Sequence, residues 1–133
     1  MSTIGSIALS GMNAATLRLQ VSASNIANAA SRGPSPGTVA VMRFPAAYAP
    51  QGVSQTTSLT GATVAVAGLV TPATIVAYDA DAPYADDGLV ASPNVGIVTE
   101  IIRQMMARFT YGANAHVLGA DARLNGMLLD TLS

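Results

Sequence analysis

The sequence predicts a mainly α-helical fold with a small β region, in which long N- and C-terminal helices pair as a coiled coil around a short, hairpin-like middle. All seven prolines lie between residues 33 and 93, so both ends of the chain are free of helix breakers. Both ends also carry apolar residues at helical spacing, whereas the middle alternates over short runs. We therefore expect an N-terminal helix in 1–32, an irregular or β middle in 33–93 and a C-terminal helix in 94–133, with the two helices forming one domain.

The N-terminal segment has a narrow apolar seam. Met12, Leu19 and Ile26 recur every seven residues, with alanines between them. Such a seam is typical of a helix that packs against one partner helix rather than against a broad core. Gly33 and Pro34 follow the segment and predict its end, because proline lacks an N–H and disfavours helix at the residue before it.

The middle of the chain contains short strand-like runs. Alternating or β-branched residues predict strands at 38–42, 63–70 and 73–78, and the Ser-Gln-Thr-Thr-Ser run at 54–58 predicts a loop. These strands would form a small antiparallel sheet or a pair of hairpins.

The C-terminal segment carries a long apolar stripe with steps of three and four residues. This spacing averages close to 3.6 residues and predicts an amphipathic helix of roughly ten turns. The other faces hold few charges, so the outer surface of this helix is under-charged for contact with water. The stripe, called the C-terminal stripe below, consists of Ile102, Met106, Phe109, Ala113, Val117, Ala120, Leu124, Leu128 and Thr131.

Each apolar seam needs a cover, and each is the other's nearest apolar partner in composition. We therefore expect the face with Met12, Leu19 and Ile26 to pack near Ile102, Phe109 and Val117, in the same chain or in a neighbouring copy.

Composition argues against several classes of function. Six arginines, no lysine and seven acidic residues give a net charge of −1, which offers no clustered positive surface for nucleic acid. The absence of cysteine removes disulfides, thiolate metal sites and thiol nucleophiles. The uncharged run from 44 to 78 is interrupted by prolines and glycines, so we expect no membrane insertion, and the first residues do not resemble a cleaved leader.

One segment could hold a cation: Asp79, Asp81, Asp86 and Asp87 lie close together in the sequence. A calcium loop of the EF-hand type fails here, because its third ligand position falls on Pro83. We prefer a polar turn in which Gly88 adopts a positive φ. A small metal-dependent enzyme or binding module using 79–87 stays open as an alternative.

Other candidate residues favour structural roles. His116 is the only histidine and lies in the predicted C-terminal helix, where an interfacial or surface position suits it better than catalysis. Glu100 is the only glutamate and suits the first turn of that helix. Gly112 and Gly119 weaken the helix and therefore suggest the close approach of another backbone.

The two ends together resemble a known family. The segments 10–14 and 21–29, with the run Asn25-Ile26-Ala27-Asn28, are similar to the N-terminal signature of the axial proteins of the bacterial flagellum. The segments 78–83, 85–90 and 93–95, and then Glu100, Met105-Met106 and 111–114, resemble the region that leads into the C-terminal helix of the short proximal-rod proteins. The short middle also favours a proximal-rod subunit over the longer distal-rod and hook proteins.

This resemblance implies a structural subunit of the flagellar basal-body rod that assembles through its terminal helices into the drive shaft and transmits torque. It implies no enzymatic activity and no cofactor. The implied partners are copies of itself, other rod proteins, the basal-body ring and the export apparatus. The implied location is the periplasmic rod, reached through the flagellar type III channel without a cleaved signal peptide. A non-rod paralogue of the axial family is the nearest alternative. The expected assembly interface consists of Met12, Leu19, Asn25, Ile26, Asn28, Ile102, Met106, Phe109, Ala113, Asn114, Val117 and Leu124.

Overall fold

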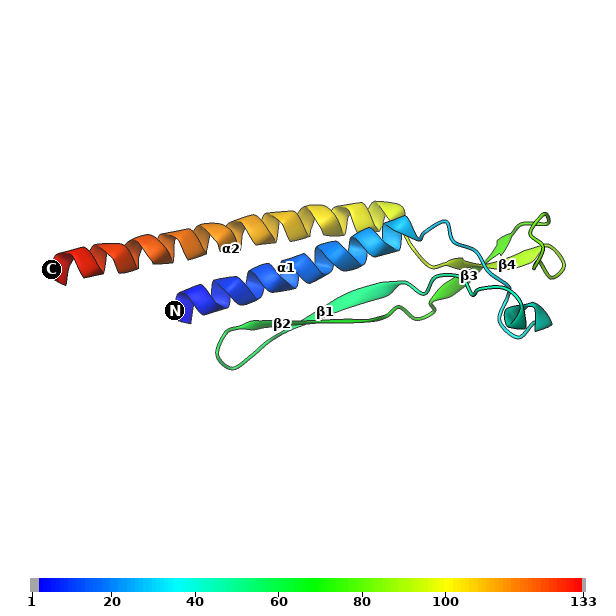
Figure 1. The fold of residues 1–133 in the computed structure, drawn as a ribbon, viewed down its shortest axis with the longest axis horizontal. Helices are drawn as coiled ribbons and strands as arrows, with labels where there is room; N and C mark the ends of the chain where they lie inside the picture. The colour runs from blue at the N-terminus through cyan, green and yellow to red at the C-terminus, as the bar shows by residue number, and fades with distance from the viewer. Residues whose placement is uncertain (1–2, 133) are drawn as a thin grey trace.

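The structure is a computed structural model that describes residues 3–132, and it contains two long helices and a small antiparallel β region (Figure 1). This architecture confirms the predicted order of helix, β-containing middle and helix. The elements in chain order are α1 (Thr3–Ala27), the short 3₁₀ helix η1 (Val39–Met42), β1 (Gln51–Thr57), β2 (Thr63–Leu69), β3 (Thr74–Tyr78), β4 (Leu89–Pro93) and α2 (Ile97–Leu132).

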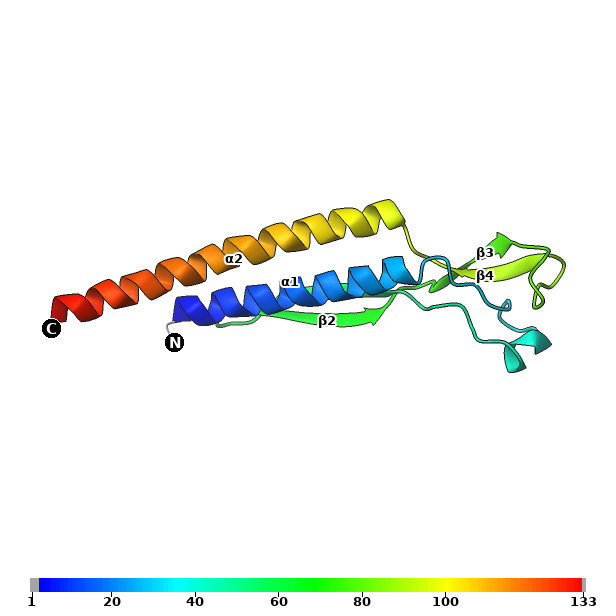
Figure 2. The same cartoon turned by 45° about the horizontal axis from the view of Figure 1, so that its top comes forward.

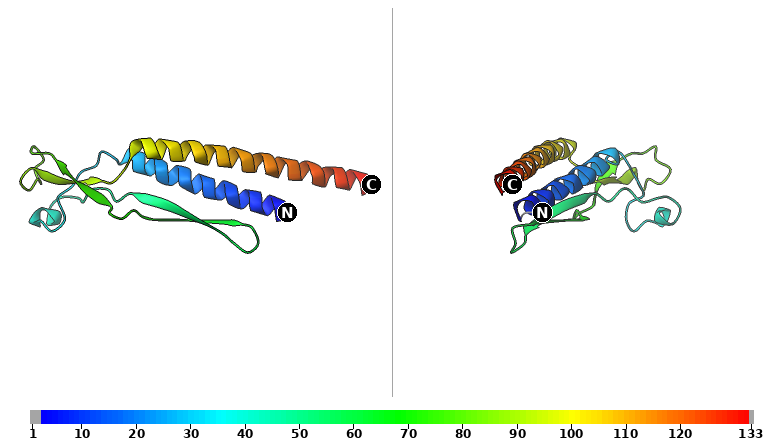
Figure 3. Two further views of the ribbon diagram at one scale, coloured as in Figure 1. Left: turned by 180° about the vertical axis from the view of Figure 1, so that it is seen from behind. Right: turned by 60° about the vertical axis from the view of Figure 1, so that its left-hand side comes forward.

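The molecule is elongated, and its two helices lie side by side in opposite directions (Figures 1 and 2). The β1–β2 hairpin lies along α1 on the side away from α2, so α1 is the middle layer (Figure 3). The β3–β4 pair and η1 lie beyond one end of the helices. The chain therefore has a long three-layer part and a smaller β end.

The β region consists of two separate two-stranded antiparallel sheets. In the first, β1 pairs with β2 from Gln51 opposite Leu69 to Thr57 opposite Thr63. In the second, β3 pairs with β4 from Thr74 opposite Pro93 to Tyr78 opposite Leu89. A two-stranded hairpin is marginal in water by itself, so the packing of β1 and β2 on α1 is what supports the first of them.

Two predictions for the middle of the chain are wrong. The expected strand at 38–42 is a 3₁₀ turn, because this segment satisfies its backbone locally: the N–H of Val41 donates to Thr38 and that of Arg43 to Ala40. The expected loop at 54–58 belongs mostly to β1. Its serines and threonines suit a hairpin strand that leaves one face in water.

The boundaries of other elements also differ from the prediction. Strand β4 was not predicted, although its Val90 and Ala91 are among the most buried residues of the described chain. Helix α1 ends at Ala27, before Gly33, and the backbone of Gly33 instead exchanges two hydrogen bonds with Ala91. The strands predicted at 63–70 and 73–78 are confirmed as β2 and β3.

The hydrophobic core of the described chain is small. Its buried apolar residues are all alanine or valine: Ala8, Ala14, Ala15, Val21, Val90, Ala91 and Ala107. Small side chains allow close packing of helix on helix, but each contributes little apolar area. The core of the described chain is therefore thin.

Helix α2 extends beyond the end of α1. It has 36 residues against 25 in α1, and the contacts Ser22–Glu100 and Gly11–Asn114 fix how the two helices are aligned. Counting along both helices from these contacts places the start of α1 level with Asp121, and Figure 1 shows α2 continuing beyond that end of α1. Residues 122–132 project past that point and are called the overhang below; the side chains of 122–131 are exposed.

Candidate functional site

The helices approach each other through small residues. A Cβ atom on Gly11 would lie only 2.6 Å from Oδ1 of Asn114, so the glycine allows α2 to pack this closely. Helix α1 is covered by α2 and by the β1–β2 hairpin. Its buried residues are Gly5, Ala8, Gly11, Ala14, Ala15, Val21, Ser22 and Asn25. Among the elements that the structure describes, α1 is the only one that contacts α2, and the face of α2 that it covers includes the buried Glu100, Ala107 and Asp121 and the half-buried Asn114.

A buried polar cluster joins α1, α2 and the start of β1. Asn25 is 1% exposed, and its Nδ2 donates to the carbonyl of Gln51 at 2.7 Å and to Oε1 of Glu100 at 3.2 Å. Its Oδ1 accepts hydrogen bonds from the N–H of Gln51 at 3.0 Å and from the hydroxyl of Tyr48 at 3.1 Å. Ser22 Oγ donates to the carbonyl of Glu100 at 2.9 Å. These five residues are called the Asn25 cluster below, because Asn25 links the others.

Glu100 is the ionisable centre of this cluster. It is 4% exposed, and its Oε1 accepts from Nη1 of Arg103 at 2.6 Å as well as from Asn25. Its Oε2 is buried and has no hydrogen-bond partner among the residues that the structure describes. A buried charge needs pairing, so Arg103 and Asn25 are what make this position tolerable for a carboxylate.

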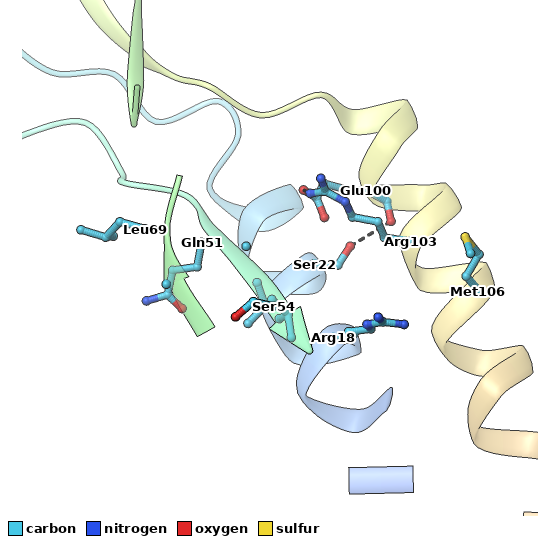
Figure 4. Close-up of a pocket in the computed structure, with 12 residues that line it drawn as sticks. Arg18, Ser22, Gln51, Ser54, Leu69, Glu100, Arg103 and Met106 are labelled. Carbon is cyan, nitrogen blue, oxygen red and sulfur yellow. Dashed lines mark hydrogen bonds and ion pairs between the residues drawn. The ribbon is translucent and has the colours of Figure 1, made fainter. Parts of the chain in front are cut away.

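A groove of about 600 Å³ lies between α1, α2 and the β1–β2 hairpin (Figure 4). Its base is formed by Arg18, Val21 and Ser22 of α1, and Arg18 also donates a hydrogen bond to Oε1 of Gln55. The walls combine polar and apolar side chains from the other two layers. They are formed by Gln51, Gly52, Val53, Ser54, Gly68 and Leu69 from the hairpin and by Glu100, Arg103 and Met106 from α2.

The predicted interface residues of α1 occupy different environments. Met12, Leu19 and Ile26 are half-buried. Asn25 is the centre of the cluster described above. Asn28 follows the last residue of α1, and its Nδ2 donates to the carbonyl of Ser24 at 2.9 Å, a carbonyl that also accepts the backbone N–H of Asn28 at 3.1 Å. The two asparagines of the Asn-Ile-Ala-Asn run therefore have separate structural roles.

The predicted interface residues of α2 lie mostly outside the helix pair. Phe109 is 80% exposed, and Ile102 and Val117 are also exposed. The helices pair within the chain, but they do not pair there through the C-terminal stripe, because α1 packs on a different face of α2 through small and polar residues. Asn114 is the exception, since it lies against Gly11. The remaining predicted residues, Met106, Ala113 and Leu124, are exposed.

The aspartate segment forms a turn. Asp87 and Gly88 have φ values of 51° and 75°, and the backbones of Asp86 and Leu89 form a bridge, as expected for a tight reversal. The carboxylate of Asp79 forms an ion pair with Arg32 at 2.7 Å. Within residues 3–132, no group of three or more histidine, cysteine, aspartate or glutamate side chains is placed to hold a metal ion.

Sequence reasoning missed part of the Asn25 cluster. Ser22 could have been found, because a serine and an asparagine three residues apart share one face of an otherwise small-residue helix. Tyr48 and Gln51 carried no such signal, since only the return of the chain along α1 brings them to Asn25. His116 is exposed on α2, as its predicted surface position implies.

Among the described residues, no helix is long and apolar enough to cross a membrane. No protein-family model matches the chain, and comparison with curated proteins gives no significant match.

Proposed function

We propose that this chain is a structural, self-assembling subunit of the proximal rod of the bacterial flagellar basal body, with its terminal helices pairing as a coiled coil. In this role it would transmit torque and would need no active site. Its partners would be copies of itself and other rod proteins, in the periplasmic part of the flagellum.

The observation that carries this proposal is the exposure of the C-terminal stripe. Its large members Ile102, Met106, Phe109, Leu124 and Leu128 are all more than half exposed in the single chain. Full burial of one such side chain contributes about 1.5–3 kcal/mol. A continuous apolar stripe of this length marks an interaction surface, and its burial between copies would drive assembly.

The resemblance of the terminal segments supports the identity of the assembly. The Asn-Ile-Ala-Asn run lies at the end of α1, where Asn25 connects both helices to the hairpin and the side chain of Asn28 donates to the last turn of the helix. A motif with this role holds the terminal helices together in one rigid unit. Such a unit suits a subunit that must carry mechanical load.

The aspartate turn does not favour the metal-dependent alternative. Asp79 is already paired with Arg32, and the remaining aspartates belong to a reversal with two positive φ values. A turn explains these residues without a ligand.

The proposal is tested by Phe109→Asp. Because Phe109 is exposed, the single chain should keep its helix content by circular dichroism. Assembly should be lost, since an unpaired carboxylate buried in every subunit contact costs several kcal/mol. Basal bodies imaged in a deletion strain that carries the variant should lack the rod, while the exported chain is still produced.

Val76→Asp is the matched control, because Val76 is 70% exposed on β3, at the other end of the molecule from the overhang. That variant should assemble. Normal basal bodies in the Phe109→Asp strain would contradict the proposed function.

A further inference from the structure

Each strand of the β1–β2 hairpin has an outer edge along which backbone groups point away from the partner strand. At the two ends of the ladder, the N–H of Val70 donates to the carbonyl of Pro50 and that of Ser58 to the carbonyl of Ala62. Bonded and non-bonded pairs alternate along an antiparallel ladder, so the even-numbered residues of this register bond across the hairpin. The N–H and C=O groups of the odd-numbered residues therefore point outward on both strands.

Helix α1 occupies only the first outward position of each strand. The N–H and the carbonyl of Gln51 bond to the side chain of Asn25, and the N–H of Thr63 donates to Oγ of Ser10. Beyond these two positions, the outward groups have no hydrogen-bond partner among the described residues. They are called the free edges below and belong to Val53, Gln55 and Thr57 in β1 and to Ala65, Ala67 and Leu69 in β2.

The free edges carry no charge, proline or bulge. These are the features with which native proteins keep an exposed edge from pairing with another strand. The segment from 51 to 69 contains no charged residue and no proline, and its register continues unbroken from one end of β1 to the other. Such an edge is a template for the addition of a further strand.

The free edge of β1 is complementary to that of β2. Both offer the same number of residues, and in an antiparallel arrangement all their outward groups can bond to one another. The pairs are Val53 with Leu69, Gln55 with Ala67 and Thr57 with Ala65. A shift by two residues in either direction leaves one residue of each edge without a free partner, because Gln51 and Thr63 are already bonded to α1. The free groups therefore favour one register.

We infer that the hairpins of successive copies of this chain join edge to edge, β1 of one copy to β2 of the next, in a continuous antiparallel sheet. The spacing of the helices points to a second copy as the partner. One hairpin advances a sheet by two strands, or about 9.6 Å, and α1 lies along the hairpin (Figure 3). Neighbouring α1 helices would then lie at a distance of roughly 8–10 Å, at which helices pack. The same step thus continues both the sheet and a layer of helices.

The contact joins two different edges. A heterologous contact of this kind can extend copy by copy into an open filament or close into a ring. This inference rests on the proposed self-assembly and specifies one of its contact surfaces.

Cysteine cross-linking tests the contact and its register, since the chain contains no cysteine of its own. In the inferred register Thr56 lies opposite Val66 of the next copy, at a non-hydrogen-bonded pair with Cβ atoms about 4.5–5.5 Å apart. Both side chains are exposed in the single chain. Full-length chains with Thr56→Cys are mixed with full-length chains with Val66→Cys and oxidised under mild conditions, and the disulfides are identified by mass spectrometry.

The matched control mixes Thr56→Cys with Val76→Cys, an exposed position on β3 outside the hairpin. We expect Thr56→Cys to form the mixed disulfide with Val66→Cys about tenfold faster than with Val76→Cys, because docking raises the local concentration of the two thiols.

Equal rates for the two mixtures, or a product dominated by two Val66→Cys chains, would overturn the inference. The second result would mean that two β2 edges pair with each other. Sedimentation of the unaltered chain at the same concentration separates this failure from that of the proposed function. If oligomers form without the preferred cross-link, only the inference fails; if the chain remains monomeric at every concentration, self-assembly itself is contradicted as well.

Discussion

Replacing Asn25 by alanine is the sharpest test of how the three layers are held together. Asn25 makes hydrogen bonds to Tyr48, Gln51 and Glu100 from a position that is 1% exposed. Alanine removes the donor and the acceptor together. It leaves the N–H and the carbonyl of Gln51 without their partner and leaves Glu100 with Arg103 alone on Oε1.

The expected loss follows from these four hydrogen bonds. Each contributes about 0.5–1.5 kcal/mol net, and a buried group left unsatisfied costs about 1–3 kcal/mol. Some of the groups freed at the edge of the hairpin would regain water, so we expect the free energy of unfolding to fall by about 3 kcal/mol. That is a large share of the roughly 5–15 kcal/mol typical of a folded domain, and this chain has a thin core.

Urea unfolding followed by circular dichroism measures this loss, and Asn28→Ala is the matched control. Asn28 makes one side-chain hydrogen bond, to the exposed carbonyl of Ser24, so its replacement should cost less than about 1 kcal/mol. Hydrogen exchange should also show faster opening of β1 in Asn25→Ala than in Asn28→Ala. If the two variants lose the same stability, or if Asn25→Ala loses less than about 0.5 kcal/mol, the Asn25 cluster does not connect the layers as we argue.

Two further predictions concern close packing and the aspartate turn. Gly11→Leu should lower the thermal midpoint of the monomer, because even its Cβ would lie 2.6 Å from Asn114 and overpacking costs about 1–3 kcal/mol. The control Gly112→Ala places no atom within 4 Å of the new Cβ and should stabilise the helix by about 1 kcal/mol. An unchanged midpoint for Gly11→Leu would refute the close contact. Changing Asp81 and Asp86 together to asparagine should leave stability and motility nearly unchanged, since asparagine suits turns as aspartate does, and a non-motile double variant rescued by calcium would identify a cation site instead.

The sequence by itself determined the two long helices and two of the four strands, β2 and β3. Prolines confined to 33–93 leave both ends free to form helix, and the alternating valines and alanines of 63–69 specify a strand, because these are local preferences of the backbone and of side-chain period. The turn at Gly88 was predictable for a related reason, since glycine tolerates the positive φ that a tight turn requires. The polar strand β1 and the 3₁₀ turn at Val39–Met42 were not predictable from the sequence, because their conformations depend on whether a partner strand lies alongside.

Only the tertiary structure decided which face of α2 meets α1. Hydrophobicity favoured the face with Ile102, Phe109 and Val117, yet α1 packs on the face with Glu100, Ala107 and Asn114. Close approach through Gly11 and the hydrogen bonds of Asn25 favour this face, and neither depends on a side chain being large and apolar. A pattern in one helix shows which residues share a face, but the choice between two usable faces is made by shape and by polar groups on another segment. The same choice leaves the C-terminal stripe exposed in the single chain.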